Sequence, residues 1–458
     1  MPHLGPNGSS DLYGAGGTGR YLVLFEEGAG KAGISALGEA IGISVATVGP
    51  EGQGIDEGAA FFEELGVAVV DAAPEQIEEA GALTRESSPI IAIEPERTVY
   101  ALEVAPAPPL PRSGNGGSPA IPSAPPTPAP APPATHTPDY LQGYRDAVLH
   151  LTAPLPSATP DAGLADLAPA AVDESQATWG LQAVRAVNSC RSGRGIRLAV
   201  LDTGFDLQHP DFAGRTIQSQ SFIPGEAVQD GHGHGTHCIG TSMGPKCARG
   251  TQRRYGVAYR AEIYSGKVLS NAGVGTDAQI LAGINWAVTN QCAVISMSLG
   301  APTAPGQAFS QVFETVASRA AQAGSLIVAA AGNDSQRPAV VNPVSHPANC
   351  PSIMAVAALD VNGAIAPFSN RGVNPNGGQI DVAGPGVDVY SSWPMPTRYR
   401  RISGTSMATP HAAGVAALLA EANPGVRGAA LGRLLTSTAW RFTTLPSADV
   451  GAGLVRAP

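Results

Sequence analysis

The segment IRLAVLD, residues 196–202, decides the fold because it is an uninterrupted apolar run that ends on a carboxylate. Three later runs share its pattern: AVISMSLG (293–300), SLIVAAAGN (325–333) and SIMAVAAL (352–359). Continuous apolar runs of this length indicate strands that are buried on both faces. Helical segments near 277–291 and 307–323 lie between them, and this alternation predicts right-handed parallel crossovers. We therefore expect an α/β domain with a doubly wound parallel sheet over residues 176–458.

Residues 105–138, upstream of this domain, carry 13 prolines in 34 positions. This composition favours solvated polyproline II and buries too little surface to fold. We interpret the segment as a linker, with a docking site for a proline-binding module as the alternative. A flexible N-terminus is expected over residues 1–19, and a junction with the processing region over residues 139–175.

Residues 20–104, before the linker, read as β-α-β-β-α-β with one inserted helix at the amphipathic segment FFEEL (61–65). This order is typical of a small ferredoxin-like α+β domain, in which helices cover one face of a sheet. No residue in this domain is of an evident catalytic type.

The composition excludes several classes of function. The chain has 458 residues and a net charge of −10, and it has no basic cluster that would contact the phosphates of a nucleic acid. No run approaches the roughly 20 apolar residues of a membrane helix. The first 20 residues lack the apolar core of a secretory signal. Five scattered cysteines do not make a disulfide scaffold or a C-x-x-C metal site.

Polar residues of catalytic type follow the predicted strands. Asp202 ends the first strand, GHGHGTHC (231–238) places His234 between glycines, and SGTSMATPHAAGVAALL (403–419) places Ser406 at the start of an apolar helix. A helix start supplies free N–H groups and a positive dipole end, and both suit a developing oxyanion. Taken alone, Asp202 reads equally well as a helix cap or a turn residue.

The blocks DTGFDLQHPDF, GHGTHCIGT and GTSMATPHAAGVAALL resemble the three signature blocks of the subtilases, the subtilisin-like serine proteases, in the family order Asp, His, Ser. The resemblance spans nearly the whole region after the linker. It implies a serine endopeptidase with Ser406 as nucleophile, His234 as general base and Asp202 as the carboxylate that orients the imidazole. It also implies that Asn333 forms the oxyanion hole with the backbone N–H of Ser406.

The same resemblance predicts that protein or peptide substrates bind as an extended strand between two edges of small residues. The implied substrate-binding residues are Gly273, Gly275, Ser298, Leu299, Gly300, Ala331, Gly332 and Ser345. Ser345 is expected at the floor of the primary specificity pocket. With no acid near it in the sequence, we expect an apolar or broad preference.

The histidines around His234 and the cysteine Cys238 allow other interpretations. His232, His234 and His237 match an H-x-H-x-x-H zinc pattern, but a zinc site leaves Asp202 and Ser406 unexplained. In the subtilase interpretation His237 packs beside the base, and His411 in the later helix is likewise structural. Cys238 resembles the cysteine of thiol-sensitive subtilases, and a small buried residue is the plainer interpretation.

The resemblance implies no cofactor for the chemistry, with structural calcium as an addition. The segment 244–258 lacks the Asn-rich loop of the strong calcium site of the family. A weaker site would use Asp381 with carbonyls near Pro351 and Ile353, and a plain loop acid is the alternative for Asp381.

A ferredoxin-like module before a subtilase is typically an inhibitory propeptide and folding chaperone. The chain is therefore interpreted as a zymogen, expected to be a monomer, with a processing point between about 104 and 178 and a candidate position just before DESQATWGL (173–181). Two alternatives stay open, a dedicated processing protease for one or few partners and a non-catalytic binding protein with an occluded cleft. The absent signal favours a cytoplasmic location, whereas the zymogen organisation favours export.

Overall fold

The computed structural model describes residues 17–42, 44–48, 59–81, 89–104 and 172–458. The Pro-rich linker and the junction up to residue 171 lie outside these ranges, as does the predicted N-terminal tail except for its last three residues, which begin the first strand. Among the described residues, no helix is both long enough and apolar enough to cross a membrane.

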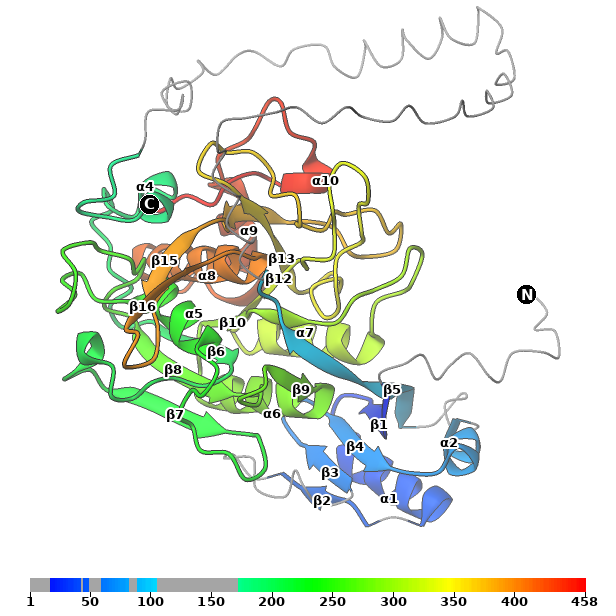
Figure 1. Ribbon diagram of the computed structural model, residues 1–458. Helices are drawn as coiled ribbons and strands as arrows, with labels where there is room; N and C mark the ends of the chain where they lie inside the picture. Colours follow the sequence, from blue (N-terminus) through cyan, green and yellow to red (C-terminus); the bar gives the residue numbers. More distant parts are fainter. Residues whose placement is uncertain (1–16, 43, 49–58, 82–88, 105–171) are drawn as a thin grey trace, which may run out of the picture. The chain divides into compact units, whose positions relative to one another are not determined.

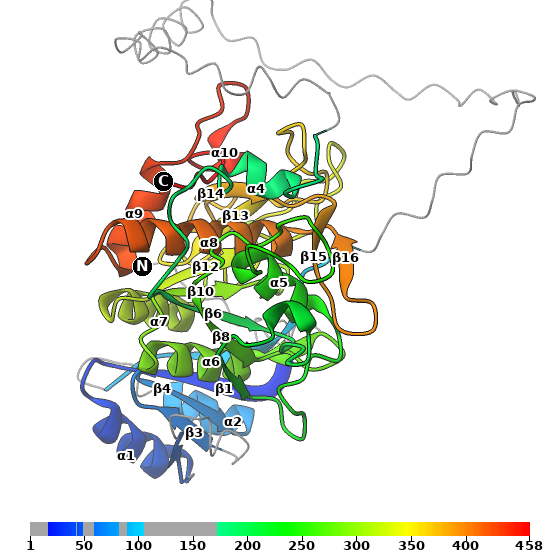
Figure 2. The same cartoon turned by 90° about the vertical axis from the view of Figure 1, so that its left-hand side faces the viewer.

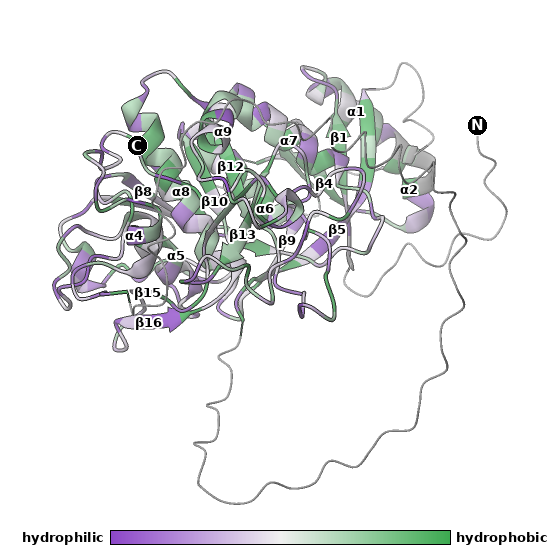
Figure 3. Ribbon diagram, turned by 90° about the horizontal axis from the view of Figure 1, so that it is seen from above, coloured by the Kyte–Doolittle hydropathy of each residue, from purple (hydrophilic) through white to green (hydrophobic). Residues whose placement is uncertain are grey.

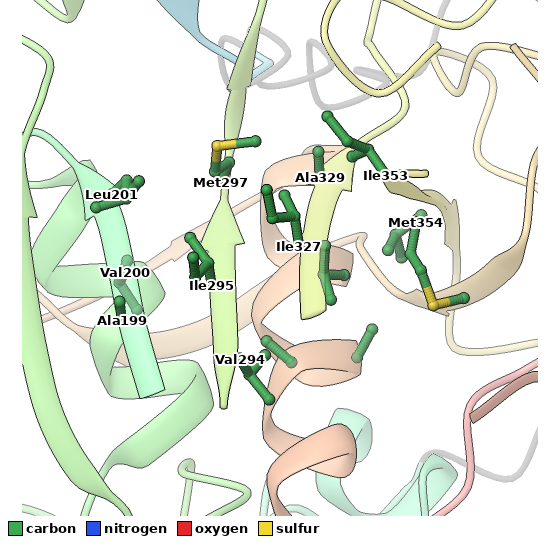
Figure 4. Close-up of a cluster of buried hydrophobic side chains, with 14 of the residues drawn as sticks. Ala199, Val200, Leu201, Val294, Ile295, Met297, Ile327, Ala329, Ile353 and Met354 are labelled. Atoms are coloured by element: carbon green, nitrogen blue, oxygen red, sulfur yellow. The ribbon is translucent and has the colours of Figure 1, made fainter. Parts of the chain in front are cut away.

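The larger domain contains a parallel sheet in the order β14-β13-β12-β10-β6-β8-β7. Its strands are β6 (Arg197–Asp202), β7 (Ile217–Ser221), β8 (Glu262–Lys267), β10 (Val294–Met297), β12 (Leu326–Ala330), β13 (Met354–Leu359) and β14 (Val382–Pro385). The four apolar runs become β6, β10, β12 and β13, which confirms the expected sheet. Figure 4 shows their buried side chains packed together at its centre. Strand β7 (IQSQS) has one apolar residue followed by four polar ones, and β14 (VAGP) holds Gly and Pro, so neither has the apolar signal.

Helices cover both faces of this sheet. They are α4 (Trp179–Ala183), α5 (His234–Met243), α6 (Asp277–Thr289), α7 (Gln311–Gln322), α8 (Thr405–Ala422), α9 (Gly428–Ser437) and α10 (Ser447–Val450). Helices α5 and α8 pack on one face, and α6 and α7 on the other (Figure 2). Every residue of α8 from Thr405 to Ala420 is buried, and Figure 3 shows its apolar character. A helix that is apolar all round is typical of a core position.

The smaller domain has the predicted order of elements with one exception. It contains β1 (Gly17–Phe25), α1 (Gly30–Ile41), β2 (Ala46–Thr47), β3 (Ala59–Phe62), β4 (Val67–Asp71), α2 (Pro74–Gly81) and β5 (Ile90–Ala101). The inserted helix at FFEEL was a wrong prediction, because Phe61 and Phe62 end strand β3 and a turn follows. Alternate residues of a strand face opposite sides of the sheet. Phe61 packs with α1 and Phe62 with the core of the larger domain, so tertiary packing overrides the helical pattern.

The second face of the small sheet is buried against the larger domain. Leu22 and Leu24 of β1 join the core of that domain, whereas Tyr21 and Val23 join a separate cluster with α1. The first, third and fifth strands contact α6 or α7. Figure 1 shows β5 running from the small sheet into the larger domain. The end of the smaller domain therefore lies against the larger domain.

Candidate active site

Asp202 and His234 come from β6 and α5. Nδ1 of His234, the first residue of α5, donates a hydrogen bond of 2.8 Å to Oδ1 of Asp202, the last residue of β6. Both side chains are buried. A Cβ at position 235 would lie 2.2 Å from the carbonyl oxygen of Gly204, so Gly235 allows the start of α5 to press against the loop after β6. The predicted pair is thus brought together by the packing of two rigid elements.

Ser406 lies at the second position of α8, beside the same pair. Its backbone oxygen accepts hydrogen bonds from Oγ of Ser298 at 2.8 Å and Sγ of Cys238 at 3.6 Å. The same sulfur lies 3.9 Å from Nδ1 of His234, so one thiol contacts both residues. Oγ of Ser406 donates to the carbonyl oxygen of Ser298 at 3.0 Å, and Nε2 of His234 is buried without a hydrogen-bond partner. The structure therefore places Ser406 and His234 against the same thiol, with the Ser406 hydroxyl turned to Ser298.

The amide of Asn333 is oriented by Thr405. Its Oδ1 accepts hydrogen bonds from the backbone N–H and from Oγ1 of Thr405, both at 2.9 Å. This fixes Nδ2 as the outward donor, and Nδ2 donates at 2.6 Å to the carbonyl oxygen of Leu102. A Cβ at Gly404 would lie 2.6 Å from that oxygen, so glycine is required for the carbonyl to approach the N-terminus of α8. A peptide carbonyl of the chain itself thus occupies the place expected for an oxyanion.

The predicted substrate edges hold the end of β5. Strand β9 (Val274–Thr276) and strand β11 (Leu299–Gly300) both pair with it in antiparallel fashion. The N–H of Ala101 donates to the carbonyl of Gly273 at 2.9 Å, and the N–H of Leu102 approaches the carbonyl of Ser298 at 3.4 Å. Beyond Leu102, the N–H of Val104 donates to the carbonyl of Ser403 at 2.9 Å. Residues on both sides of the Leu102–Glu103 bond are therefore fixed by backbone hydrogen bonds.

Of the remaining predicted pocket residues, Gly300 lies beside the Leu102 side chain, which is 8% exposed, and the others are linked to Gly300 through Ser345. A Cβ built on Gly300 would lie 3.2 Å from Cδ1 of Leu102 and 3.5 Å from Cβ of Ser345. Ser345 is joined to Ala331 through its N–H, and a Cβ on Gly332 would meet its Oγ at 2.2 Å. Small residues therefore leave room here for the leucine.

One part of the pocket prediction was wrong. An acid does lie beside Ser345, since Oδ2 of Asp334 accepts hydrogen bonds from Oγ of Ser345 at 3.3 Å and from Nδ2 of Asn370 at 3.1 Å. Asp334 directly follows Asn333 in the sequence, and that adjacency was the available signal. Asp334 is hydrogen-bonded to two neutral groups, and the side chain in the pocket, Leu102, is apolar. This agrees with the expected apolar preference.

Burial sets the charge states around the base. Burial alone lowers the pKa of His234, but the adjacent Asp202 carboxylate reverses this and holds that pKa well above its usual value. Burial lowers the pKa of His237 to about 3 and that of His411 to about 4, so both are neutral structural imidazoles. Burial raises the pKa of the Cys238 thiol to about 11, which makes it a poor nucleophile near neutrality.

The zinc interpretation has no support in the described part of the chain. The one group of three His, Cys, Asp or Glu residues there with ligand atoms close enough for a metal is Asp202, His234 and Cys238. It contains neither His232 nor His237, and Nε2 of His237 instead donates to the carbonyl of Val389 at 3.0 Å.

Asp381 has features of a structural acid. Its Oδ2 accepts a hydrogen bond of 2.8 Å from the N–H of Ala355, and burial raises its pKa to about 6. A calcium ion takes about six to eight oxygen ligands, so this single carboxylate would need several carbonyl or water ligands beside it. Calcium at Asp381 stays a prediction.

Comparison with known proteins gives one consistent result. Residues 193–453 match the model of the subtilase family. Subtilisin Savinase of Lederbergia lenta is 40% identical over 284 residues, which covers 61% of this chain and 96% of that protein. Subtilisin E of Bacillus subtilis (strain 168) is 39% identical over 250 residues, or 54% of this chain and 61% of that protein. An alkaline protease of Alkalihalobacillus alcalophilus is 40% identical over 284 residues, with 61% and 68% covered.

Proposed function

We propose that Ser406, His234 and Asp202 are the nucleophile, the general base and the orienting carboxylate of this chain, which belongs to the subtilase family and is a serine endopeptidase. One observation carries the assignment. The carbonyl of Leu102 accepts a hydrogen bond from Nδ2 of Asn333 and lies close to Gly404, just before α8, as the carbonyl of a bound substrate would. The residue roles follow from this position because the attacking oxygen, the base and the oxyanion donor must surround one carbonyl carbon.

The mechanism needs one side-chain rotation. The Ser406 hydroxyl leaves the Ser298 carbonyl and turns to Nε2 of His234, which is buried and unpartnered. His234 takes the proton as Oγ attacks the carbonyl carbon, and later gives it to the leaving amine. The Asp202 carboxylate stabilises the imidazolium formed between these steps. Asn333 and the backbone N–H of Ser406 stabilise the negative oxygen, and water then hydrolyses the acyl-enzyme.

A fluorophosphonate probe, which reacts with activated serines, tests this assignment. After incubation of the chain to completion of any self-cleavage, peptide mapping by mass spectrometry should find the probe on Ser406. The probe should also stop casein hydrolysis. Labelling of a different serine, or hydrolysis that persists when Ser406 is fully labelled, would contradict it.

Asn333→Ala should lower kcat by about 10² to 10³, with a much smaller change in KM. This is the size known for removal of one oxyanion donor in subtilisin, and the donor acts mainly in the transition state. Steady-state hydrolysis of a chromogenic peptide measures both constants. Asn362→Ala, at an exposed loop position, is the control and should match the wild type. An equal loss in both variants, or a change in KM alone, would remove Asn333 from this role.

The N-terminal domain is proposed as an intramolecular inhibitor and folding chaperone. Two acidic side chains of β5 support this. Oε1 of Glu94 accepts a hydrogen bond from the N–H of Gln311 at 2.6 Å, at the start of α7. Oε1 of Glu96 accepts one from the N–H of Ala278 at 3.0 Å, at the start of α6. Carboxylates at helix N-termini stabilise the helix. The N-terminal domain therefore stabilises the folded form of the peptidase domain whose cleft it occupies.

We place the first self-cleavage at the Leu102–Glu103 bond, just before the window given by the sequence. The residues before this bond pair with β9 and β11, and Val104 after it bonds to Ser403. Cleavage there would leave Leu102 as a product carboxylate in the site, which accounts for inhibition by the released domain. The Pro-rich segment would then begin the mature chain.

Leu102→Asp should slow self-cleavage by more than about 100-fold, because it buries a charge against Gly300 and Ser345, beside the Asp334 carboxylate. A time course of intact mass measures the rate. Tyr100→Ser is the matched control, since the Tyr100 side chain on the same strand is 44% exposed. Unchanged cleavage of the Leu102→Asp chain after residue 102 would contradict the placement.

The range of substrates follows from the same contacts. Backbone pairing along β5 is common to all sequences and favours broad cutting. The buried side chains of Val99 and Leu102 restrict two positions of the peptide. Cleavage of a random peptide library distinguishes this from a dedicated processing protease, which would cut few members.

A further inference from the structure

Asp277 is a buried carboxylate that the proposed mechanism does not use. It is the first residue of α6, and its side chain is fully buried. Nε2 of His346 donates to its Oδ1 at 2.9 Å, which fixes the orientation of the carboxylate. Its Oδ2 then faces β5 and accepts a hydrogen bond of 3.0 Å from the backbone N–H of Arg97. One oxygen is thus held by the enzyme and the other by the strand in the cleft.

The register places this contact at a defined distance from the proposed cleavage. Thr98 pairs with Thr276, so the preceding residue of β5, Arg97, lies beside Asp277. Arg97 is the sixth residue before the Leu102–Glu103 bond. A separate peptide that binds along β9 and β11 in the same way would bring its own sixth residue to Asp277.

The charges at this position are complementary. Nη1 of Arg97 lies 3.5 Å from Oδ2 of Asp277 and is buried without a hydrogen-bond partner, and the Arg97 side chain is only 25% exposed. The guanidinium also lies 3.6 Å from Glu94, but Glu94 belongs to the N-terminal domain. A short peptide substrate lacks that acid, so Asp277 would be the acid that such a peptide meets.

We infer that Asp277 is a specificity-determining residue, which favours an arginine or lysine six residues before the cleaved bond. The inference rests on the proposed function, because it uses β5 as the guide to substrate position. A purely structural role at the start of α6 would stabilise the helix and leave all substrates equally affected. The preference between substrates therefore separates the two roles.

Two octapeptides test this, Arg-Thr-Val-Tyr-Ala-Leu-Glu-Val and the same peptide with citrulline, the neutral isostere, in place of arginine. The self-processed wild-type enzyme should cleave the arginine peptide with a kcat/KM about three- to tenfold higher, the range for a partly buried ion pair. In Asp277→Asn this ratio should fall to about one, whatever the overall activity of the variant. Glu262→Gln removes an exposed acid and should keep the wild-type ratio.

A wild-type ratio of one, or a ratio that persists in Asp277→Asn, would overturn the inference. If that variant does not fold, the wild-type enzyme alone decides the matter, since a peptide with glutamate at the sixth position should be cleaved several-fold more slowly than one with glutamine. Equal rates would again overturn it. Failure of the proposed function has a different signature, in which the wild-type enzyme cleaves none of these peptides and Ser406 takes up no probe.

Discussion

Ser406→Ala should lower kcat by about 10⁶, the loss established for the nucleophile of subtilisin, while the chain stays folded. The Ser406 hydroxyl is the one proposed to form the acyl-enzyme. Its removal takes away one hydrogen bond to Ser298 but leaves the two that the Ser406 carbonyl accepts. The hydrolysis of casein and of a chromogenic peptide measures the loss. Circular dichroism and the thermal midpoint should match the wild type.

The control for this variant is Ser447→Ala, an exposed serine at the start of α10, which should hydrolyse casein at the wild-type rate. A Ser406→Ala protein that retains more than about a hundredth of the activity would assign the chemistry to another group. A contaminating protease is excluded if the residual activity co-purifies with the chain.

Asp202→Asn should lower kcat by about 10⁴, the factor known for the corresponding aspartate of trypsin-like enzymes, and should also move the pH profile. The Asp202 carboxylate holds the pKa of His234 well above its usual value against the effect of burial. A general base works when it is deprotonated, so the wild-type kcat/KM should fall as the pH drops below a midpoint higher than 6.5. Without the carboxylate, burial acts alone and the midpoint should move to lower pH.

The pH dependence of kcat/KM for one neutral peptide, measured for the wild type and the variant, gives both effects. Glu262→Gln, which removes an exposed carboxylate paired with Arg197, controls for a general change in charge and should leave the midpoint in place. A midpoint that moves upward in Asp202→Asn would mean that this carboxylate does not set the protonation of His234.

The sequence was sufficient to propose the catalytic residues because each stands in a local context. Asp202 ends an apolar strand, His234 lies among glycines and Ser406 opens an apolar helix. The same holds for the four central strands, whose burial on both faces leaves a continuous apolar run. Strand β7, in which four of five residues are polar, and the FFEEL segment, whose strand pairing depends on β4, have no such local signal.

The contacts that define the substrate position were beyond the sequence because they join distant segments. Leu102 reads as the end of a strand, and only the docking of the small sheet on α6 and α7 brings its carbonyl to Asn333, 231 positions later. Asp277 reads as an ordinary acid at a helix start, and its pairing with Arg97 and His346 depends on the same docking. An interface between domains depends on the shapes of the two surfaces that meet, and the periodicity of the sequence carries no information about them.

The mass of the intact chain during incubation at neutral pH tests the central claim most directly, because it reports where the chain is cut and whether Ser406 cuts it. We predict that the wild type divides between Leu102 and Glu103, with a fragment of residues 1–102 and a complement that begins at Glu103. The Ser406→Ala chain should keep its full mass over the same time. A first cut elsewhere, or an equal cut in the Ser406→Ala chain, would contradict the account.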